Sequence, residues 1–217
     1  MAASFSPCVS AQSLPGAITL ACSAPNSVGN QADLSTAPGT WGINTGSGLI
    51  AASSALNHAW STNNAAVGNH WIGADVSAPA SDIPYSLSVV ANSTNIVLSS
   101  AKITYSYFVD NSVNSITWNG SALPSDGGST SFVNPPYILT TPTQVPLTYG
   151  NNKLLFNTHN SDGPYGLNAK ITLTFDCAPP VIQTAPTNTP WTLWLLSGLI
   201  LAGVAGVVGR GRGRAAR

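Results

Sequence analysis

The stretch Lys102-Ile103-Thr104-Tyr105-Ser106-Tyr107-Phe108-Val109 carries the clearest fold signal in this chain. Side chains alternate between the two faces of an extended strand, so every second residue shares a face. One face of this stretch is apolar and consists of Ile103, Tyr105, Tyr107 and Val109. The other carries the polar residues Lys102, Thr104 and Ser106. This period of two predicts a β-strand with one buried face.

Similar strand signals recur along the chain, at residues 17–21, 83–89, 113–118, 153–159 and 170–176, and residues 69–73 resemble a short buried strand. Pro84 indicates a sheet edge or a strand start, because proline cannot donate to a ladder. Turn residues such as Asn119-Gly120 and Asp126-Gly127-Gly128 separate these segments. No helical period occurs before the C-terminal tail. We therefore predict an all-β sandwich of antiparallel sheets.

The composition is that of an extracellular β-protein. Charged residues make up only 6% of the chain, against about 25% in ordinary domains. Three lysines and seven aspartates give the part before the tail a formal charge of −4, and four arginines give the tail +4. This faintly acidic main part argues against nucleic acid as a partner, because nucleic-acid binding requires a basic face.

Three cysteines, Cys8, Cys22 and Cys177, leave one thiol over after any pairing. In an oxidising compartment a Cys22–Cys177 bridge would join the two ends of the main β region. A Cys8–Cys22 bridge is the alternative, and the sequence alone does not choose between them.

The C-terminal tail predicts a transmembrane helix. Residues 191–209 contain no charged residue, and as a helix they would be roughly 28 Å long, close to the ~30 Å hydrocarbon core of a bilayer. The basic residues 210–217 follow directly, as the positive-inside rule expects of a cytoplasmic end. We therefore expect an inner-membrane anchor with the rest of the chain outside the cytoplasm.

The chain divides by composition into five parts. Residues 1–35 are expected to be a lead-in, 36–177 the sandwich, 178–190 a Pro/Thr linker, 191–209 the transmembrane helix and 210–217 the cytoplasmic tail. The first residues lack the basic and apolar regions of a signal peptide. Because the predicted orientation requires export, we expect that a signal peptide is absent from this sequence or already cleaved.

The order of several short motifs resembles a known fold family. An aromatic strand ends in Asp110-Asn111, a second strand ends in Asn119-Gly120, a strand opens with Gly150-Asn151-Asn152, and Gly163-Pro164-Tyr165-Gly166-Leu167 leads into the last strand. This layout, over about residues 36–177, resembles the galactose-binding-domain-like jelly roll shared by many carbohydrate-binding modules. The resemblance implies a jelly-roll β-sandwich and polysaccharide as the first ligand class to test.

The tail resembles a bacterial sorting signal. Pro186-Thr187, then Trp191, the apolar segment and the arginines Arg210, Arg212 and Arg214 are similar to the IPTL-CTERM signals, relatives of PEP-CTERM signals. The resemblance implies cleavage by an exosortase-type membrane protease and delivery to the surface or secretion. A plain membrane anchor is the alternative.

Five residues are candidates for ligand binding. Trp60, Trp118 and Tyr165 could stack against sugar rings, with core packing as the alternative. Asp110 and Asn111 could take part in a ligand site or in a structural Ca²⁺ site, although an Asx turn at the strand end is favoured. No resident cofactor is otherwise expected, and the sequence leaves the metal question open.

Catalytic motifs are absent from the sequence. His58, His70 and His159 have no metal-ligand spacing, there is no glutamate, and nothing pairs two aspartates for glycoside hydrolysis. The sequence therefore predicts a non-catalytic, exported bacterial cell-surface protein that binds a ligand, with glycan first. A structural envelope or matrix component is the alternative and a hydrolase comes third. Two aspartates, or an aspartate and a histidine, clustered in one cleft would favour the hydrolase.

Overall fold

The computed structural model describes residues 15–44, 49–52, 60, 70–78, 80–128, 132 and 135–179. The chain divides into two compact units, Met1–Pro180 and Val181–Arg217, and all described residues belong to the first. These residues form strands, turns and loops, and they include no helix that could cross a membrane. The predicted transmembrane helix, the basic tail and the sorting residues Pro186, Thr187 and Trp191 lie outside the described residues.

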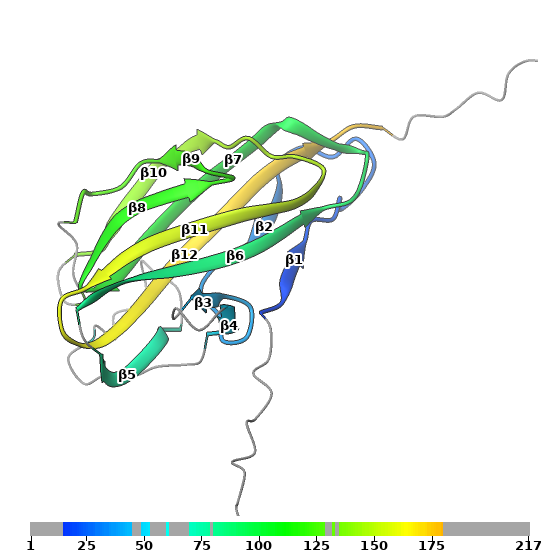
Figure 1. Cartoon of the computed structure of the whole chain (residues 1–217). Helices are drawn as coiled ribbons and strands as arrows, with labels where there is room; N and C mark the ends of the chain where they lie inside the picture. Colours follow the sequence, from blue (N-terminus) through cyan, green and yellow to red (C-terminus); the bar gives the residue numbers. More distant parts are fainter. Residues whose placement is uncertain are drawn as a thin grey trace, which may run out of the picture. The chain divides into compact units, whose positions relative to one another are not determined.

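Seven strands form one sheet, here called sheet A (Figure 1). Six of them follow the order β4-β3-β6-β11-β8-β9, and β1 pairs with β6 beside β3. Their bounds are β1 Ala17–Thr19, β3 Gly42–Asn44, β4 Leu49–Ala51, β6 Ser81–Ala91, β8 Ser112–Trp118, β9 Ser121–Leu123 and β11 Gly150–Asn160. Among the described pairs β1 and β6 alone are parallel, which departs from the fully antiparallel sheets expected.

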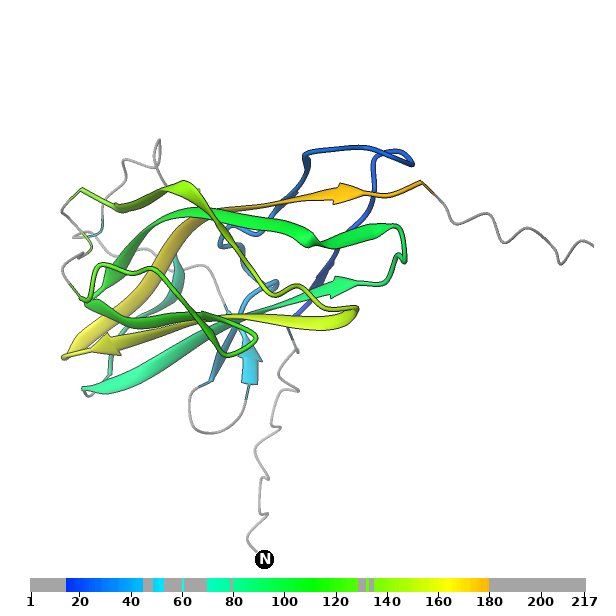
Figure 2. The ribbon, with the colours of Figure 1, turned by 90° about the horizontal axis from the view of Figure 1, so that it is seen from above.

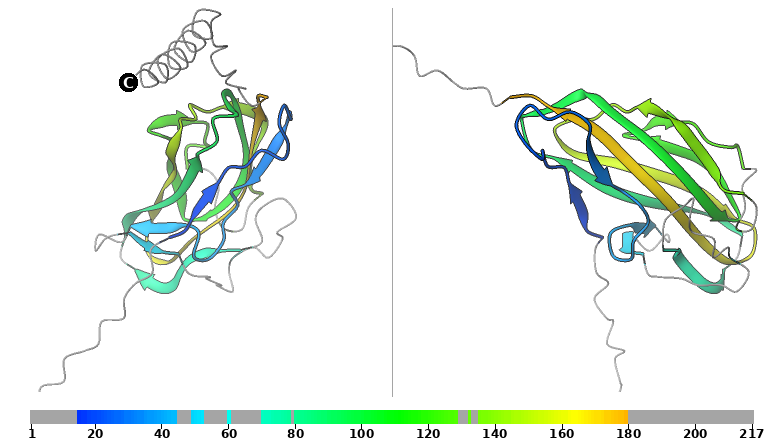
Figure 3. Two further views of the ribbon diagram at one scale, coloured as in Figure 1. Left: turned by 90° about the vertical axis from the view of Figure 1, so that its right-hand side faces the viewer. Right: turned by 180° about the vertical axis from the view of Figure 1, so that it is seen from behind.

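Five strands form sheet B, in the order β10-β7-β12-β2, with β5 also pairing with β12. Their bounds are β2 Asn30–Asp33, β5 Ile72–Ala78, β7 Ile96–Asp110, β10 Tyr137–Gln144 and β12 Gly163–Cys177. Figures 2 and 3 show the two sheets facing each other as layers. The described part of the chain is therefore an all-β sandwich, as the sequence predicts.

The core lies between the sheets and follows the alternation read from the sequence. The apolar face of β7, formed by Ile103, Tyr105, Tyr107 and Val109, is buried. Phe156 of β11 makes edge-to-face contacts with Trp41 and Tyr107, at ring-centroid distances of 5.8 and 5.7 Å. Such pairs contribute about 0.5–1.5 kcal/mol each beyond the burial of their area. The aromatic residues thus join the two sheets.

A disulfide joins Cys22 to Cys177, with a sequence separation of 155. Cys22 lies between β1 of sheet A and β2 of sheet B, and Cys177 ends β12. This is one of the two pairings that the sequence allowed. Cys8, the other candidate partner, lies outside the described residues.

The sandwich begins earlier in the chain than expected. β1 and β2 belong to its two sheets, although both fall within residues 1–35, which were expected to be a lead-in. β2 pairs with residues Thr172–Phe175 near the C-terminal end of β12. The short strands β2, β3, β4 and β9 were not predicted, because three or four residues are too few to show a period.

Candidate functional site

The outer face of sheet A carries a cluster of polar side chains. Strand pairing places Asp82 of β6 opposite His159 of β11, and His159 opposite Ser112 of β8. Two residues before His159 on β11, Asn157 pairs with Pro84 of β6 on one side and with Ser115 of β8 on the other. These residues alternate with buried Ile83 and Phe156, so they point away from the core.

A bulge in β8 adds a further side chain to this face. The register with β11 shifts between Asn157 and Thr158, which pair with Ser115 and Val113. Asn114 is therefore the extra residue of β8, and it is exposed. Bulges re-aim side chains in this way. Here the result is that Asn114 Nδ2 donates a hydrogen bond of 3.1 Å to Asp82 Oδ1, two strands away.

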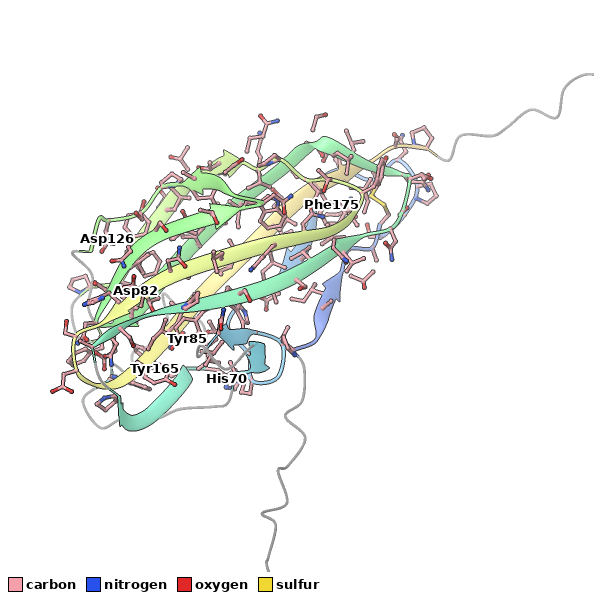
Figure 4. All side chains as sticks on the ribbon, in the orientation of Figure 1. His70, Asp82, Tyr85, Asp126, Tyr165 and Phe175 are labelled. Atoms are coloured by element: carbon pink, nitrogen blue, oxygen red, sulfur yellow. A yellow bond between two sulfur atoms is a disulfide. The ribbon has the colours of Figure 1, made fainter. Side chains whose placement is uncertain are left out.

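Asp82 holds two neighbours in place. Its Oδ1 accepts from Asn114 Nδ2 and also lies 2.9 Å from His159 Nδ1. The side chains of Asp82 and His159 are 69% and 42% exposed, so their pairing contributes at most about 1 kcal/mol to stability. Its main consequence is geometric, because it sets the orientation of an amide and an imidazole on an open surface. Figure 4 labels Asp82 on this sheet.

These residues border a groove of about 460 Å³ on sheet A, here called the sheet A groove, lined by Asn44, Asp82, Pro84, Asn114 and Asn157. The lining comes from β3, β6, β8 and β11. Four strands at about 4.8 Å spacing give a span of roughly 14 Å. Amide and carboxylate groups bind hydroxyl groups well. The groove is therefore suited to a hydroxyl-rich ligand longer than one sugar unit.

Sheet B carries a smaller hollow of about 220 Å³, lined by Thr104, Tyr105, Ser106, Ile138, Leu139, Lys170 and Thr172. Its described lining contains a lysine and no carboxylate, which is the opposite of the sheet A groove. Elsewhere on the outer face of sheet B, the large apolar side chains of Trp71 and Phe108 are buried.

Trp118, a candidate for sugar stacking with core packing as the alternative, is fully buried. It pairs with Leu154, and both side chains face the core between the sheets. Its Nε1 has no hydrogen-bond partner among the described residues. No face of this ring is accessible, so the alternative of core packing describes Trp118.

Trp60 is also buried, at 4% exposure, in a second apolar cluster outside the main core. This tryptophan cluster consists of Trp60, Trp71 and Phe108, with Phe132 against it. Trp60 stacks on Trp71 at 4.6 Å, and Trp71 on Phe108 at 6.2 Å. Phe108 lies between the inward-facing Tyr107 and Val109, so the cluster covers the outer face of sheet B. Trp60 therefore packs there and offers no platform to a sugar.

Gly166 of β12 makes room for the tryptophan cluster. A Cβ atom at this position would lie 2.6 Å from Trp60 Cη2 and 3.0 Å from Trp71 Cε3. Gly73 similarly lets β5 approach β12, because its Cβ would lie 2.2 Å from the carbonyl oxygen of Tyr165, and its φ is +147°. Two glycines thus bring the segment around Trp71 onto sheet B.

Asp110 and Asn111 form a hydrogen-bonded strand end. Trp60 Nε1 donates to Asp110 Oδ2 at 2.7 Å, and Asn111 Nδ2 donates to Asp110 Oδ1 at 2.7 Å. Asn111 Oδ1 in turn accepts from the backbone N–H of Ser161. Burial raises the pKa of the Asp110 carboxyl, and the hydrogen bond from Trp60 partly offsets that rise. Both carboxylate oxygens already have protein donors, which supports a structural role.

The described residues contain no group of three or more His, Cys, Asp or Glu that could hold a metal ion. They therefore offer no support for the structural Ca²⁺ considered at Asp110 and Asn111. Tyr165 lies beside them, since Gly166 pairs with Asp110. Tyr165 is half-buried and packs against the core, and burial raises the pKa of its hydroxyl. It is the one aromatic candidate of the three that keeps some exposure.

The structure thus brings together Trp60, Asp110, Asn111 and Tyr165, and it places Trp118 elsewhere in the core. The groove residues Asp82, Asn114 and Asn157 were not singled out from the sequence. Alternation with buried neighbours could have placed Asp82 and Asn157 on an outer face. Their convergence depends on the pairing of β6, β11 and β8, which the sequence does not show.

Comparisons with known proteins add little. No known protein family matches the chain, and no curated protein matches it. A solved structure of an exo-beta-1,3-galactanase from Phanerochaete chrysosporium is similar at 13% sequence identity and a TM-score of 0.25. The match covers 68% of this chain and 29% of the galactanase chain. A similarity this low supports no argument about substrate or mechanism.

Proposed function

We propose that this chain is a non-catalytic, exported cell-surface protein whose sandwich binds a glycan in the sheet A groove. The observation that carries the proposal is the convergence of Asp82, Asn114 and Asn157 from three neighbouring strands on one open face. Fixed polar groups in a shallow groove suit ligands whose surface consists of hydroxyl groups. On this proposal the tryptophans stabilise the fold and do not contact the ligand.

The Cys22–Cys177 disulfide supports the exported location, because disulfides persist mainly in oxidising compartments. The finer assignment to the jelly-roll class is part of the proposal. It is supported by the way the chain from β6 to β12 crosses between the sheets: β6, β8 and β11 lie in sheet A and β7, β10 and β12 in sheet B, with the β8–β9 hairpin as the exception.

Delivery by the C-terminal sorting signal is part of the same proposal and rests on the sequence. On this view an exosortase-type protease removes residues 191–217 after export. Intact mass of the surface form tests the step. A mass that ends upstream of Trp191 supports processing, and a mass that includes residues 191–217 leaves a plain membrane anchor.

A glycan array with the full chain in mild detergent tests the binding function. We expect binding to at least one polysaccharide class, with loss of that binding in the Asn114→Ala and Asn157→Ala double variant. Wild-type protein that binds no glycan would contradict the proposal and favour a structural envelope or matrix component.

A hydrolase is the second candidate, because Asp82 and His159 do cluster beside the groove. Ser112 continues their row on β8, but it makes no hydrogen bond to His159 among the described residues. Release of reducing ends from any bound polysaccharide, abolished by His159→Ala, would favour this function. Prolonged incubation without release supports the binding protein.

A further inference from the structure

The hydrogen bonds inside the sheet A groove determine which polar atoms it presents to a ligand. A carboxylate only accepts hydrogen bonds, so the amide nitrogen of Asn114 must face Asp82 and its Oδ1 must face outward. Asn157 Nδ2 donates to Ser115 Oγ at 3.1 Å, which likewise leaves Asn157 Oδ1 outward. Asp82 Oδ2 has no partner among the described residues. Asp82 Oδ2, Asn114 Oδ1 and Asn157 Oδ1 are therefore acceptors that can receive hydrogen bonds from the hydroxyl groups of a ligand.

The charge of the groove points in the same direction. Among the described residues that line the groove, Asp82 is the one formally charged residue, and none of them is a lysine or an arginine. Lys153, on the same strand as Asn157, is four residues away, about 13 Å along β11. His159 touches Asp82 and is charged only when protonated. An anionic sugar would thus meet outward oxygens and a carboxylate without a fixed cation.

We infer that the sheet A groove selects neutral, hydroxyl-donating polysaccharide chains and rejects acidic ones, and that Asp82 is the residue that determines this selectivity. The inference rests on the proposed glycan-binding function and names the ligand class of that site. The roughly 14 Å between its outermost strands also predicts that the groove holds several consecutive sugars of a chain.

Two ligands of equal length test the inference: a neutral glucan hexasaccharide and a galacturonate hexasaccharide, titrated by calorimetry into the full chain in mild detergent. Two like charges about 4 Å apart repel by roughly 1 kcal/mol even in bulk water and by more near a protein surface. We therefore expect the galacturonate to bind at least about tenfold more weakly than the glucan. This deficit should shrink at high salt, because exposed charges are screened.

Asp82→Asn keeps the size of the side chain and one acceptor oxygen while removing the charge. It should narrow the difference between the two ligands to within about threefold, mainly by strengthening galacturonate binding. Asp33→Asn is the matched control, because Asp33 is an exposed carboxylate on sheet B and its replacement changes net charge equally. It should leave the tenfold difference in place.

The outcomes distinguish a failure of the inferred selectivity from a failure of the proposed glycan site. Galacturonate binding as strong as glucan binding would overturn the selectivity while leaving the glycan site in place. An unchanged preference in Asp82→Asn, or an equal change in Asp33→Asn, would overturn the role of Asp82. Binding of neither hexasaccharide would overturn the proposed function together with this inference.

Discussion

The outer faces of the two sheets differ in what covers them. On sheet A, Asp82, Asn114 and Asn157 stand open to solvent and bind one another or near neighbours. On sheet B, Trp71 and Phe108 are only 3% exposed, because the segment around Trp60 packs over them. The tryptophan cluster thus closes its part of the outer face of sheet B, whereas the polar residues of the sheet A groove stay accessible.

This contrast corrects an expectation that is natural for a sugar-binding protein. Tryptophans attract attention in a sequence because exposed rings stack on sugars, yet they also contribute most to burial. In this sandwich Trp41, Trp60, Trp71 and Trp118 are all buried. None of the described residues that line the sheet A groove is aromatic. On the proposed function, recognition there depends on hydrogen bonds.

Removing the Cys22–Cys177 disulfide should have the largest effect on stability, because it destabilises the whole sandwich and therefore both of its outer faces. On a chain-entropy estimate, the 155-residue separation of Cys22 and Cys177 corresponds to about 5 kcal/mol. The Cys22→Ser and Cys177→Ser double variant should therefore lose much of its stability to urea. Urea unfolding followed by tryptophan fluorescence measures this loss. A change below about 1 kcal/mol would show that the bridge contributes little.

Gly166→Ala should disturb the packing of the tryptophan cluster on the outer face of sheet B and leave the sheet A groove unchanged. The added methyl would lie 2.6 Å from Trp60 Cη2, so the tryptophan cluster must shift, at a cost of about 1–3 kcal/mol. Thermal unfolding measures the cost, and glycan binding on sheet A should stay unchanged. Gly16→Ala is the control, since its methyl makes only an ordinary 3.7 Å contact. Equal stability of the two variants would contradict the packing described for Trp60.

Asp110→Asn probes the electrostatics of the covered face. Burial raises the pKa of Asp110 in the folded state above its unfolded value. The stability that this carboxyl contributes is therefore complete below the unfolded pKa and is lost as pH rises through the folded pKa. Wild-type protein should therefore lose stability relative to Asp110→Asn as the pH rises above about 3.9, the pKa of an unperturbed aspartate. Urea unfolding at several pH values measures the difference, and a difference independent of pH would contradict the raised pKa.

Asn157→Ala should have the smallest effect on stability, within about 0.5 kcal/mol, because its side chain lies on the open face of sheet A. Its effect on binding should be larger, a loss of about threefold to tenfold, which corresponds to one hydrogen bond. Calorimetry with the neutral glucan measures it. Gln144→Ala on sheet B serves as a control and should bind normally. Loss of stability without loss of binding would reverse the roles assigned to the two faces.

The sequence predicts much of the fold because long strands repeat the period of two. The apolar faces of β7 and β12 are legible in this way, and both are buried as expected. The site is less predictable for a physical reason. Asp82, Asn114 and Asn157 are up to 75 residues apart in the chain and meet through the register of three strands and one bulge. Local alternation shows that a residue faces outward without showing its neighbours.

The sequence did not decide whether Trp60 and Trp118 are buried or exposed, for a related reason. Trp118 directly precedes the turn Asn119-Gly120, a position that is often exposed. Its register opposite Leu154 instead places the ring between the sheets. Trp60 follows no readable strand pattern, and its burial depends on the small size of Gly166 on a distant strand. Both outcomes depend on contacts that are remote in sequence.

The most direct test of a ligand site on sheet A is amide chemical-shift mapping with the neutral glucan hexasaccharide on isotopically labelled protein. We predict saturable shifts at the side-chain amides of Asn44, Asn114 and Asn157 and at the backbone of Asp82, with the indole signals of Trp60 and Trp118 unchanged. Shifts confined to Tyr165, Asn111 and Trp60, with none in the groove, would contradict the account and move the site to the end of sheet B.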